Sequence, residues 1–325
     1  MATNGSIPMT GLTHFILVGF QTSSTTKTLL TAVFSLAYAL TLLENATIVA
    51  IVKWDAKLHT PMYFFLSKLS CLETLFVSIT LPNMLNDLAS GNNRISVWGC
   101  LLQLYFFLSI GSSECFLLAA MAYDRYVAIC KPLLYHSVMT PVVCWSLTGS
   151  CMFWGFFPTS FGIGLIAQLH FCHSRVDHYF CDVSPIIKLS CEDISTIELV
   201  DFVTSLFVLL VSLVLIIVSY TYIISAVKKI TSDRGWKKSL STCSSHLIVV
   251  VLFFGTTIFM YARPQAIDSY DSNKLLSLLY SFIIPMLNPV IYTLRNSDIR
   301  NSIQNTFRIC FFDKAESQTL AKKKV

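Results

Sequence analysis

Four charged side chains lie within or beside long apolar runs, where charge is costly. Glu73 and Glu114 each interrupt such a run, and Asp124 and Arg125 adjoin in the stretch MAYDRYVAIC. Ionisable residues in membrane segments are rare and mark functional sites by default. If two such carboxyls lie close together, they cannot both ionise cheaply without a cation, so they would bind one or share protons. The adjacent aspartate and arginine can neutralise each other; the structural alternative is an arginine whose long side chain reaches the membrane surface.

Four of the 11 cysteines are candidates for disulfides on the outer side of a membrane. Cys172, Cys181 and Cys191 share one polar segment, and Cys100 lies at the start of a long apolar run. Four cysteines allow three pairings, and sequence alone does not choose among them. The polar segment also holds HYFCD (178–182), which would suit a metal ion only with a free thiolate. We predict disulfides and no metal, because an oxidising compartment favours bridges.

No constellation of residues indicates catalysis. The sequence shows no nucleophile–base pair in a plausible cleft, no His/Cys metal spacing and no glycine-rich phosphate loop. The net charge of +5 is too modest to suggest a nucleic-acid surface. We therefore expect neither an enzyme nor a nucleic-acid-binding protein.

The composition indicates a membrane protein. Hydrophobic residues make up 54% of the 325 residues and charged residues only 13%, whereas soluble proteins carry about 25% charged residues. A spanning helix needs about 20 mostly apolar residues. Seven runs are long enough, at 28–52, 61–86, 97–123, 141–166, 197–227, 239–262 and 275–295. The predicted fold is an all-α bundle of seven membrane-spanning helices.

Lysine and arginine are unevenly divided between the two sides of these runs. Sixteen follow the first, third, fifth and seventh runs, and six lie on the opposite side. Because cytoplasmic loops are enriched in Lys and Arg, the N-terminus is predicted to lie outside. The first 26 residues contain neither, so we expect no cleavable signal peptide. The predicted parts are an extracellular N-terminus (1–26), the seven-helix domain (27–296) and a cytoplasmic segment (297–325).

Two features lie outside the seven runs. The tail from Ser297 to Phe312 places Ile299, Ile303, Phe307 and Phe311 four residues apart. This spacing predicts a short amphipathic helix on the inner membrane face. At the other end, Asn4-Gly5-Ser6 is an N-glycosylation sequon on the predicted outer side, which makes Asn4 the expected acceptor.

Several motifs identify the type of seven-helix protein. Asp124-Arg125-Tyr126 ends the third run, and the seventh contains Asn-Pro-x-x-Tyr; both resemble motifs of rhodopsin-like G-protein-coupled receptors. The strings LHTPMYFFLS, MAYDRYVAIC, KSLSTCSSHL and PMLNPVIYTLRN look like signatures of vertebrate odorant receptors. The long loop after the fourth run is similar to that of tetrapod-type class II members. The resemblance extends from about residue 10 to residue 300.

This resemblance implies a multi-pass receptor of the plasma membrane. Its expected partners are a small odorant, membrane lipid and a stimulatory, olfactory-type G protein that raises cyclic AMP. It also implies the disulfides Cys100–Cys181 and Cys172–Cys191. The implied activation switch comprises Asp124, Arg125, Tyr126, Tyr220, His246, Asn288, Pro289 and Tyr292.

Two of the implied sites keep alternatives open. Glu73, Glu114 and Asn288 surround the place that holds sodium in many rhodopsin-like receptors, so the choice lies between sodium and shared protons. No other cofactor is expected. His246 could be a pH switch, a hydrogen-bonding partner near Asp124 and Arg125, or a structural histidine.

By the same resemblance, the ligand pocket lies between the outer halves of the third, fifth, sixth and seventh helices. The expected lining is apolar with a few hydroxyls, which favours small uncharged molecules with one oxygen function. An aspartate at position 107 would have indicated an amine ligand, but Phe107 stands there. For any single lining residue, interhelical packing is the alternative role. The set is Leu104, Phe107, Leu108, Gly111, Ser112, Thr204, Ser205, Val208, Phe254, Thr257, Ile258, Tyr261, Leu278 and Ser281.

Two positions depart from the family pattern, and two other protein classes compete with it. Glu44 stands where a small residue is usual, and Phe254 stands where tyrosine is usual. A transporter or channel would also span repeatedly, but it should show an internal repeat or paired broken helices. A non-olfactory rhodopsin-like receptor is disfavoured by LHTPMYFFLS.

Overall fold

The computed structural model describes residues 12–20, 22–229, 233–261, 277–296 and 298–306. Within the described helices, the side chains of residues 233–242, 259–261, 279, 280 and 295 are also left undescribed. The predicted acceptor Asn4, the tail residues Phe307 and Phe311, and the side chain of Tyr261 therefore lie outside the described part.

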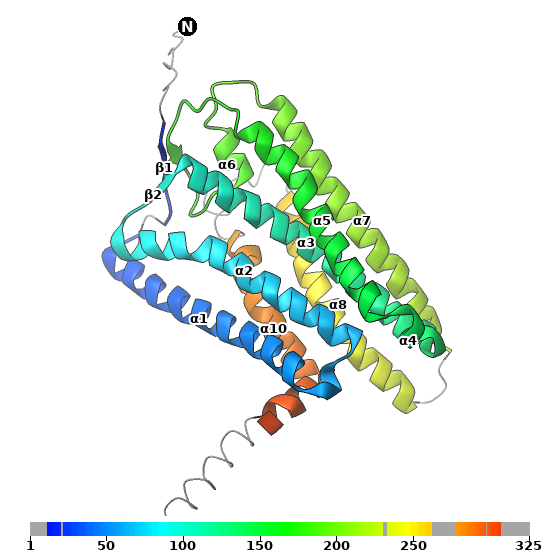
Figure 1. Cartoon of the computed structure of the whole chain (residues 1–325). Helices are drawn as coiled ribbons and strands as arrows, with labels where there is room; N and C mark the ends of the chain where they lie inside the picture. Colours follow the sequence, from blue (N-terminus) through cyan, green and yellow to red (C-terminus); the bar gives the residue numbers. More distant parts are fainter. Residues whose placement is uncertain (1–11, 21, 230–232, 262–276, 297, 307–325) are drawn as a thin grey trace, which may run out of the picture.

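In the described part of the chain, seven long helical segments form one elongated bundle (Figure 1). Five are long and apolar enough to cross a membrane, and the last two contain the shorter apolar stretches Cys243–Ile258 and Ser281–Leu294. Short helices η1 (Ala56–Leu58), η2 (Pro132–Leu134), α4 (Tyr135–Val138) and α6 (Val183–Ile187) lie in the connections. The predicted bundle is confirmed. Its long segments are α1 (Ser24–Trp54), α2 (Pro61–Ser90), α3 (Val97–Cys130), α5 (Pro141–Ile166), α7 (Ser195–Val227), α8 (Asp233–Tyr261) and the π-helical η4 (Leu279–Ile283) leading into α10 (Ile284–Arg295).

Local sequence signals explain where several of these helices begin and end. The side chains of Ser23, Ser96 and Thr140 accept hydrogen bonds from backbone N–H groups at the starts of α1, α3 and α5. Such caps satisfy donors that have no partner within the helix. Pro61 opens α2, where its missing N–H costs nothing. Gly91 ends α2 with φ 67°, a conformation that suits glycine.

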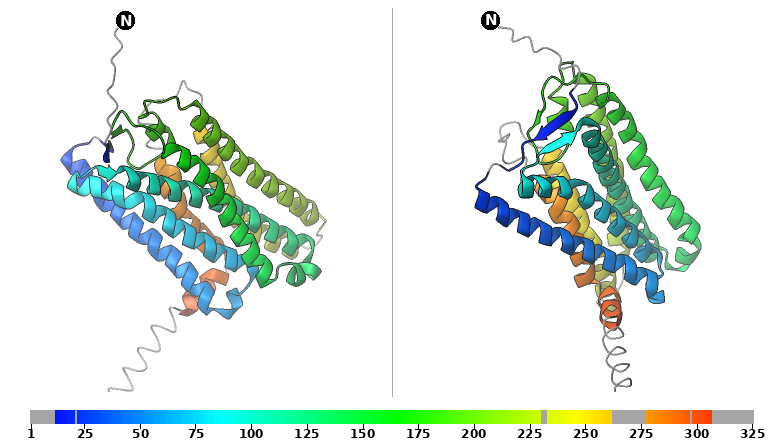
Figure 2. Two further views of the ribbon diagram at one scale, coloured as in Figure 1. Left: turned by 45° about the horizontal axis from the view of Figure 1, so that its top comes forward. Right: turned by 60° about the vertical axis from the view of Figure 1, so that its left-hand side comes forward.

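A small sheet, which the sequence did not predict, caps one end of the bundle. Strand β1 (His14–Leu17) pairs antiparallel with β2 (Arg94–Ser96) and parallel with β3 (Arg175–Val176). Figure 2 shows β1 and β2 beside one end of the helices. Phe15 and Leu17 from β1 are buried in a separate apolar cluster with Val176 and Leu104. Strand β1 is therefore anchored to this end of the bundle by backbone pairing and by burial of its apolar side chains.

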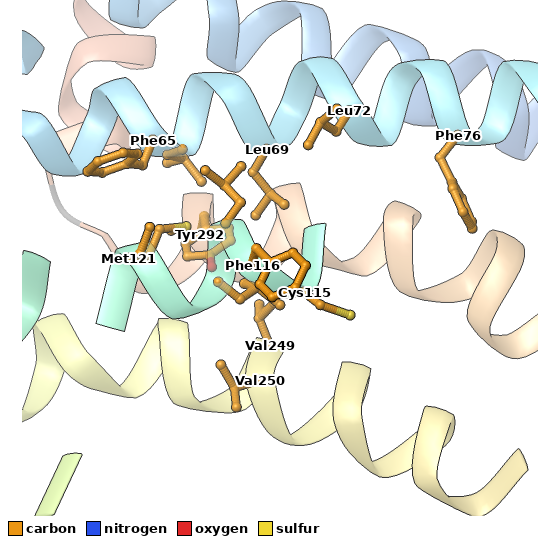
Figure 3. Close-up of a cluster of buried hydrophobic side chains, with 14 of the residues drawn as sticks. Phe65, Leu69, Leu72, Phe76, Cys115, Phe116, Met121, Val249, Val250 and Tyr292 are labelled. Atoms are coloured by element: carbon orange, nitrogen blue, oxygen red, sulfur yellow. The ribbon is translucent and has the colours of Figure 1, made fainter. Parts of the chain in front are cut away.

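Helix α3 lies at the centre of the bundle. It contacts α2, α5, α7 and α8, and 72% of its most apolar window is buried, against 22% for α5 and α7. Phe65, Leu69 and Leu72 of α2 face Phe116 of α3 in the main apolar cluster, which also includes Val249 of α8 (Figure 3). A movement of α3 or α8 must therefore repack this cluster.

Helix α5 packs directly against α3 at Gly155. A Cβ atom added to Gly155 would lie 2.7 Å from the carbonyl oxygen of Ser109 and 2.8 Å from the backbone nitrogen of Ser113. Real Cβ atoms essentially never come so near. Glycine is required here for close approach of two backbones rather than for an unusual φ.

The tail continues as a short helix, as its spacing predicted. Residues 298–306 are helical, Ile299 is buried in the main cluster, and Ile303 packs against it. Tyr63 of α2 donates a hydrogen bond to Asp298 at 3.0 Å. This end of the tail is therefore attached to the bundle.

Candidate activation switch and ligand cleft

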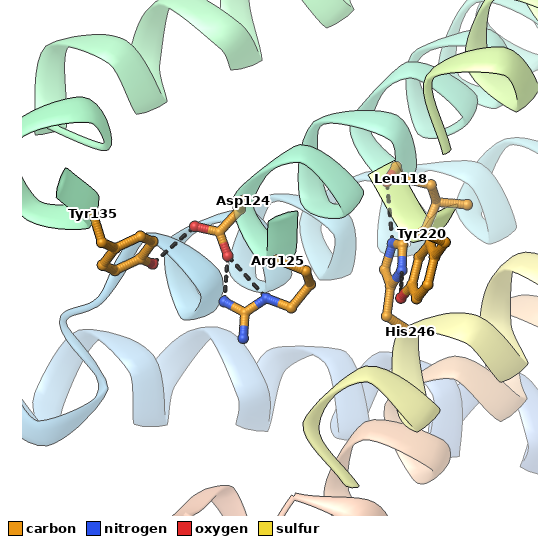
Figure 4. Close-up of polar contacts among 6 residues, drawn as sticks. All are labelled: Leu118, Asp124, Arg125, Tyr135, Tyr220 and His246. Carbon is orange, nitrogen blue, oxygen red and sulfur yellow. Dashed lines mark hydrogen bonds and ion pairs between the residues drawn. The ribbon is translucent and has the colours of Figure 1, made fainter. Parts of the chain in front are cut away.

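The Asp-Arg pair that interrupts the apolar sequence is a closed ion pair. Arg125 donates from Nε to Asp124 Oδ2 at 3.0 Å and also from Nη2 to the same oxygen. Tyr135 of α4 donates its hydroxyl to the other oxygen, Oδ1, at 2.8 Å (Figure 4). Asp124 is 0% exposed and Arg125 8%. Both carboxylate oxygens are satisfied, so the charges cancel without water.

Tyr135 is a functional candidate that the sequence did not indicate. It lies 11 residues after Asp124, beyond a lysine and a proline, so the only available signal was a tyrosine in the first cytoplasmic turn after the motif. Burial, and next the Asp124 carboxylate, raise the pKa of Tyr135 above its ordinary value. The hydroxyl therefore stays protonated at neutral pH and remains a donor.

A second polar group joins three helices deeper in the bundle. His246 of α8 is 3.1 Å from the carbonyl oxygen of Leu118 through Nε2 and 2.8 Å from the Tyr220 hydroxyl through Nδ1. A carbonyl oxygen only accepts, so Nε2 carries the proton and neutral His246 accepts from Tyr220 at Nδ1. Its hydrogen bonds go to Leu118 of α3 and Tyr220 of α7, and neither Asp124 nor Arg125 is among its partners (Figure 4).

The remaining switch residues occupy the same half of the bundle. Tyr126 is half-buried, with its ring 5.6 Å from that of Tyr222. Pro289 lies within α10, one turn before Tyr292. Tyr292 is buried, and its hydroxyl has no hydrogen-bond partner within the described part of the chain.

The intramembrane carboxyls meet Asn288 in a buried polar group. Asn288 donates from Nδ2 to Glu73 Oε1 at 2.6 Å, and Glu114 is close enough to Glu73 for their charges to interact. All three residues are no more than 3% exposed. Among described residues, Glu114 Oε1 and Asn288 Oδ1 have no hydrogen-bond partner. Unpaired oxygens in a dry site can bind a proton or a hard cation.

An open cleft lies between the outer halves of α3, α5 and α7. It contains about 470 Å³ of empty space, part of it open to the surroundings. Five of the predicted ligand-binding residues line it: Leu108 and Ser112 on α3, and Thr204, Ser205 and Val208 on α7. The rest of the lining is Pro158, Thr159, Gly162, Ile163 and Ile166 of α5, Val183 of α6, and Ile197, Val200 and Asp201 of α7. The contribution of α5 was not predicted.

The outer loop fills the space beside the seventh segment. The Tyr179 hydroxyl lies 3.1 Å from Ser281 Oγ, and His178 Nε2 lies 3.1 Å from Ser277 Oγ. The Phe180 ring is 4.8 Å from that of Phe107. The predicted ligand residues Phe107 and Ser281 are thus contacted by loop residues here.

The sequence comparison decides the family. A family model described as "Olfactory receptor" matches residues 34–309. This chain belongs to the olfactory receptor family. It is 48% identical to human olfactory receptor 6B3 over 294 residues, which cover 90% of this chain and 89% of that one. It is 46% identical to human olfactory receptor 6Y1 over 295 residues (90% and 91%), and 46% to mouse olfactory receptor 6B9 over 299 residues (92% and 95%).

The fold comparison agrees with this assignment. The crystal structure of squid rhodopsin superposes with a TM-score of 0.73, covering 91% of this chain and 84% of that one at 13% sequence identity. That identity supports the fold alone. Family membership makes the chain a multi-pass signalling receptor of the plasma membrane, with small-molecule ligands and G-protein partners, and not an enzyme.

Apart from Tyr261, whose side chain is outside the described part, the other predicted ligand residues of this olfactory receptor are described but do not line the cleft. Leu104 belongs to the outer apolar cluster, and Gly111 faces Phe76 of α2. On α8, Phe254 is buried, Thr257 donates to the carbonyl of Phe253 at 2.8 Å, and Ile258 is exposed. Leu278 packs against the main cluster.

The outer cysteines of the receptor form two disulfides, Cys100–Cys181 and Cys172–Cys191. These are the pairs that the resemblance implied, and a metal site at HYFCD cannot use the bridged Cys181 thiolate. Glu44 lies half-buried on α1, and its Oε2 has no partner among described residues; nothing in the structure assigns it a role.

Proposed function

We propose that this receptor binds small, mostly apolar volatile molecules among its outer helix halves and activates a stimulatory, olfactory-type G protein. Cyclic AMP would then rise. The observation that carries the proposal is the placement of α3. Its outer half lines the cleft through Leu108 and Ser112, and its inner end holds the closed Asp124–Arg125 pair. From Ser112 to Asp124 is about 18 Å along the helix.

The inner contacts indicate what activation must change. His246 ties α8 to the Leu118 carbonyl of α3 and to Tyr220 of α7. An outward movement of α8 would break both hydrogen bonds and expose Arg125. A ligand shifts this equilibrium only by binding the open state more tightly than the closed one. We therefore propose that the odorant contacts α7 and α8 differently in the two states.

The proposed pocket extends from the cleft toward α8 and the seventh segment. Replacing Phe107 or Tyr261 by alanine should change agonist potency without loss of surface expression. The control is Leu36→Ala, since the Leu36 side chain is 63% exposed on the surface of α1. The measurement is a dose–response curve of cyclic AMP for an active volatile, with surface receptor quantified in the same cells. Unchanged curves for both variants would refute the pocket.

The buried polar group of Glu73, Glu114 and Asn288 is proposed as a sodium site or a shared-proton pair. The unpaired Glu114 and Asn288 oxygens fit either role, because sodium and protons both bind hard oxygen ligands. Bound there, the ion would supply the positive charge that two close carboxylates require. The Asn288–Glu73 hydrogen bond orients one of those carboxylates.

A further inference from the structure

The cleft between α3, α5 and α7 contains one ionisable side chain. Asp201 lies on the same face of α7 as Ile197, Thr204, Ser205 and Val208, at helical spacings of three and four residues. That face is apolar at both ends and polar in the middle. A carboxylate among apolar walls needs a partner, because burying an unpaired charge is costly.

The described surroundings of Asp201 supply no positive charge. Its lining residues in the described ranges include no lysine, arginine or histidine. Within the same ranges its carboxyl has no hydrogen bond or ion pair, and the charge that acts on it is that of another carboxyl, Asp182. Asp182 accepts from the backbone N–H of Val183, which also lines the cleft. The local potential is therefore negative.

The rest of the lining is suited to an aliphatic or aromatic body. Leu108, Ile163 and Val208 present hydrocarbon from three helices. Ser205 and Thr204 add hydroxyls beside Asp201. Ligand pockets commonly combine such apolar walls with a few placed polar groups that fix orientation.

On the basis of the function proposed above, we propose that this cleft binds small primary amines, with the ammonium group on Asp201 and the hydrocarbon chain along α3 and α5. A charge-assisted hydrogen bond in a partly dry cleft is stronger than a neutral one. On α3, the position at which an aspartate would have indicated an amine ligand holds Phe107. The carboxylate of this cleft comes instead from Asp201 of α7. The ligands of this cleft therefore include cations, whereas the lining expected from the sequence indicated uncharged molecules.

The test compares n-hexylamine with 1-hexanol, which has the same chain length and no charge. Full-length receptor is expressed as wild type, Asp201→Asn and Glu198→Gln. Glu198 is the matched control because it is an exposed carboxylate on the same helix and does not line the cleft. Cyclic AMP is measured against concentration. A second readout is the amine-induced increase in the melting temperature of purified receptor, which requires binding but no G protein.

We expect hexylamine to activate wild type and Glu198→Gln equally, and to be weaker on Asp201→Asn by about tenfold or more. The response to hexanol should not differ between wild type and Asp201→Asn. Equal hexylamine curves for wild type and Asp201→Asn would overturn the amine site.

The remaining outcomes separate this proposal from the proposed function. If hexanol activates the receptor but hexylamine neither activates nor stabilises it, the amine site is wrong and the odorant receptor function stands. If hexylamine stabilises wild type but not Asp201→Asn and cyclic AMP stays flat, the amine site stands and the coupling is wrong. If neither compound activates or stabilises the receptor, the amine site is refuted, and so is the proposed response to small volatiles of this chain length.

Discussion

Removing one hydroxyl from Tyr135 should raise the basal activity of the receptor. In Tyr135→Phe, Asp124 loses the hydrogen bond at Oδ1 and keeps only Arg125 on Oδ2. The ring remains, so the packing of α4 is preserved. The closed ion pair is stabilised by this hydroxyl, whereas a receptor with Arg125 turned toward a G protein no longer uses it. The substitution therefore destabilises the closed state selectively.

The magnitude follows from the charge on the acceptor. A hydrogen bond to an ionised group contributes about 1.5–3 kcal/mol. Tyr135 is half-buried, so water can partly replace its hydroxyl and the lower end of that range applies. Because 1.4 kcal/mol corresponds to a factor of ten, the ratio of closed to open receptor should fall by about tenfold. Basal cyclic AMP should rise by up to the same factor while the open fraction remains small.

The assay is ligand-free cyclic AMP divided by surface receptor. The matched control is Tyr123→Phe, since Tyr123 is 40% exposed on the same end of α3 and its hydroxyl has no hydrogen-bond partner among the residues that the structure describes. A double-variant cycle with Asp124→Asn isolates the interaction. If the hydroxyl acts through Asp124, adding Tyr135→Phe to Asp124→Asn should change basal activity little.

Two results would refute this reasoning. One is basal activity in Tyr135→Phe equal to wild type and to Tyr123→Phe at matched surface levels. The other is full additivity in the double variant, because the hydroxyl would then act independently of the carboxylate.

Three further predictions concern packing, the outer loop and the polar core. Gly155→Ala should lower the free energy of unfolding of the purified receptor by about 1–3 kcal/mol through overpacking. Gly149→Ala should not, because a Cβ atom there meets nothing within 4 Å. Equal melting temperatures for the two variants would contradict the close contact between α5 and α3. Cys172→Ser should destabilise the outer loop by about 3 kcal/mol for a closed loop of this size, with a double Cys172/Cys191 serine variant no worse than either single one in thermal denaturation. Sodium should raise the melting temperature of wild type but not of Glu73→Gln if the ion binds; no sodium effect on stability or activation in either would leave shared protons as the explanation.

The sequence was sufficient for the helices because each depends on one local property, apolar length. The fourth predicted run, 141–166, coincides with α5 (Pro141–Ile166). The third was expected to end at residue 123, yet α3 continues to Cys130. Its last turns contain Asp124 and Arg125. These two charged residues end the apolar run in the sequence, although the backbone hydrogen bonds of the helix continue beyond them. Hydropathy therefore placed the end of this helix too early.

The parts that the sequence did not predict depend on distant contacts. Strands of two to four residues carry no period that could be recognised, and β3 is defined only by its pairing with β1. The Tyr135–Asp124 bond depends on the turn through η2, and the α5 side of the cleft depends on how close Gly155 lets the helices approach. Motifs located the ionisable residues, but their partners were set by tertiary packing.

The outer sheet also imposes an order on biosynthesis. Leu17 pairs with Val176, so a strand made at the very beginning must wait until four membrane spans have been inserted before its parallel partner exists. Pairing over such a sequence separation is slow to form. The outer cap therefore closes late, after the helices that it covers. An affinity tag placed before residue 12 should leave this closure intact, whereas a deletion through Leu17 would remove the central strand of the sheet and leave both β2 and β3 without a partner from β1.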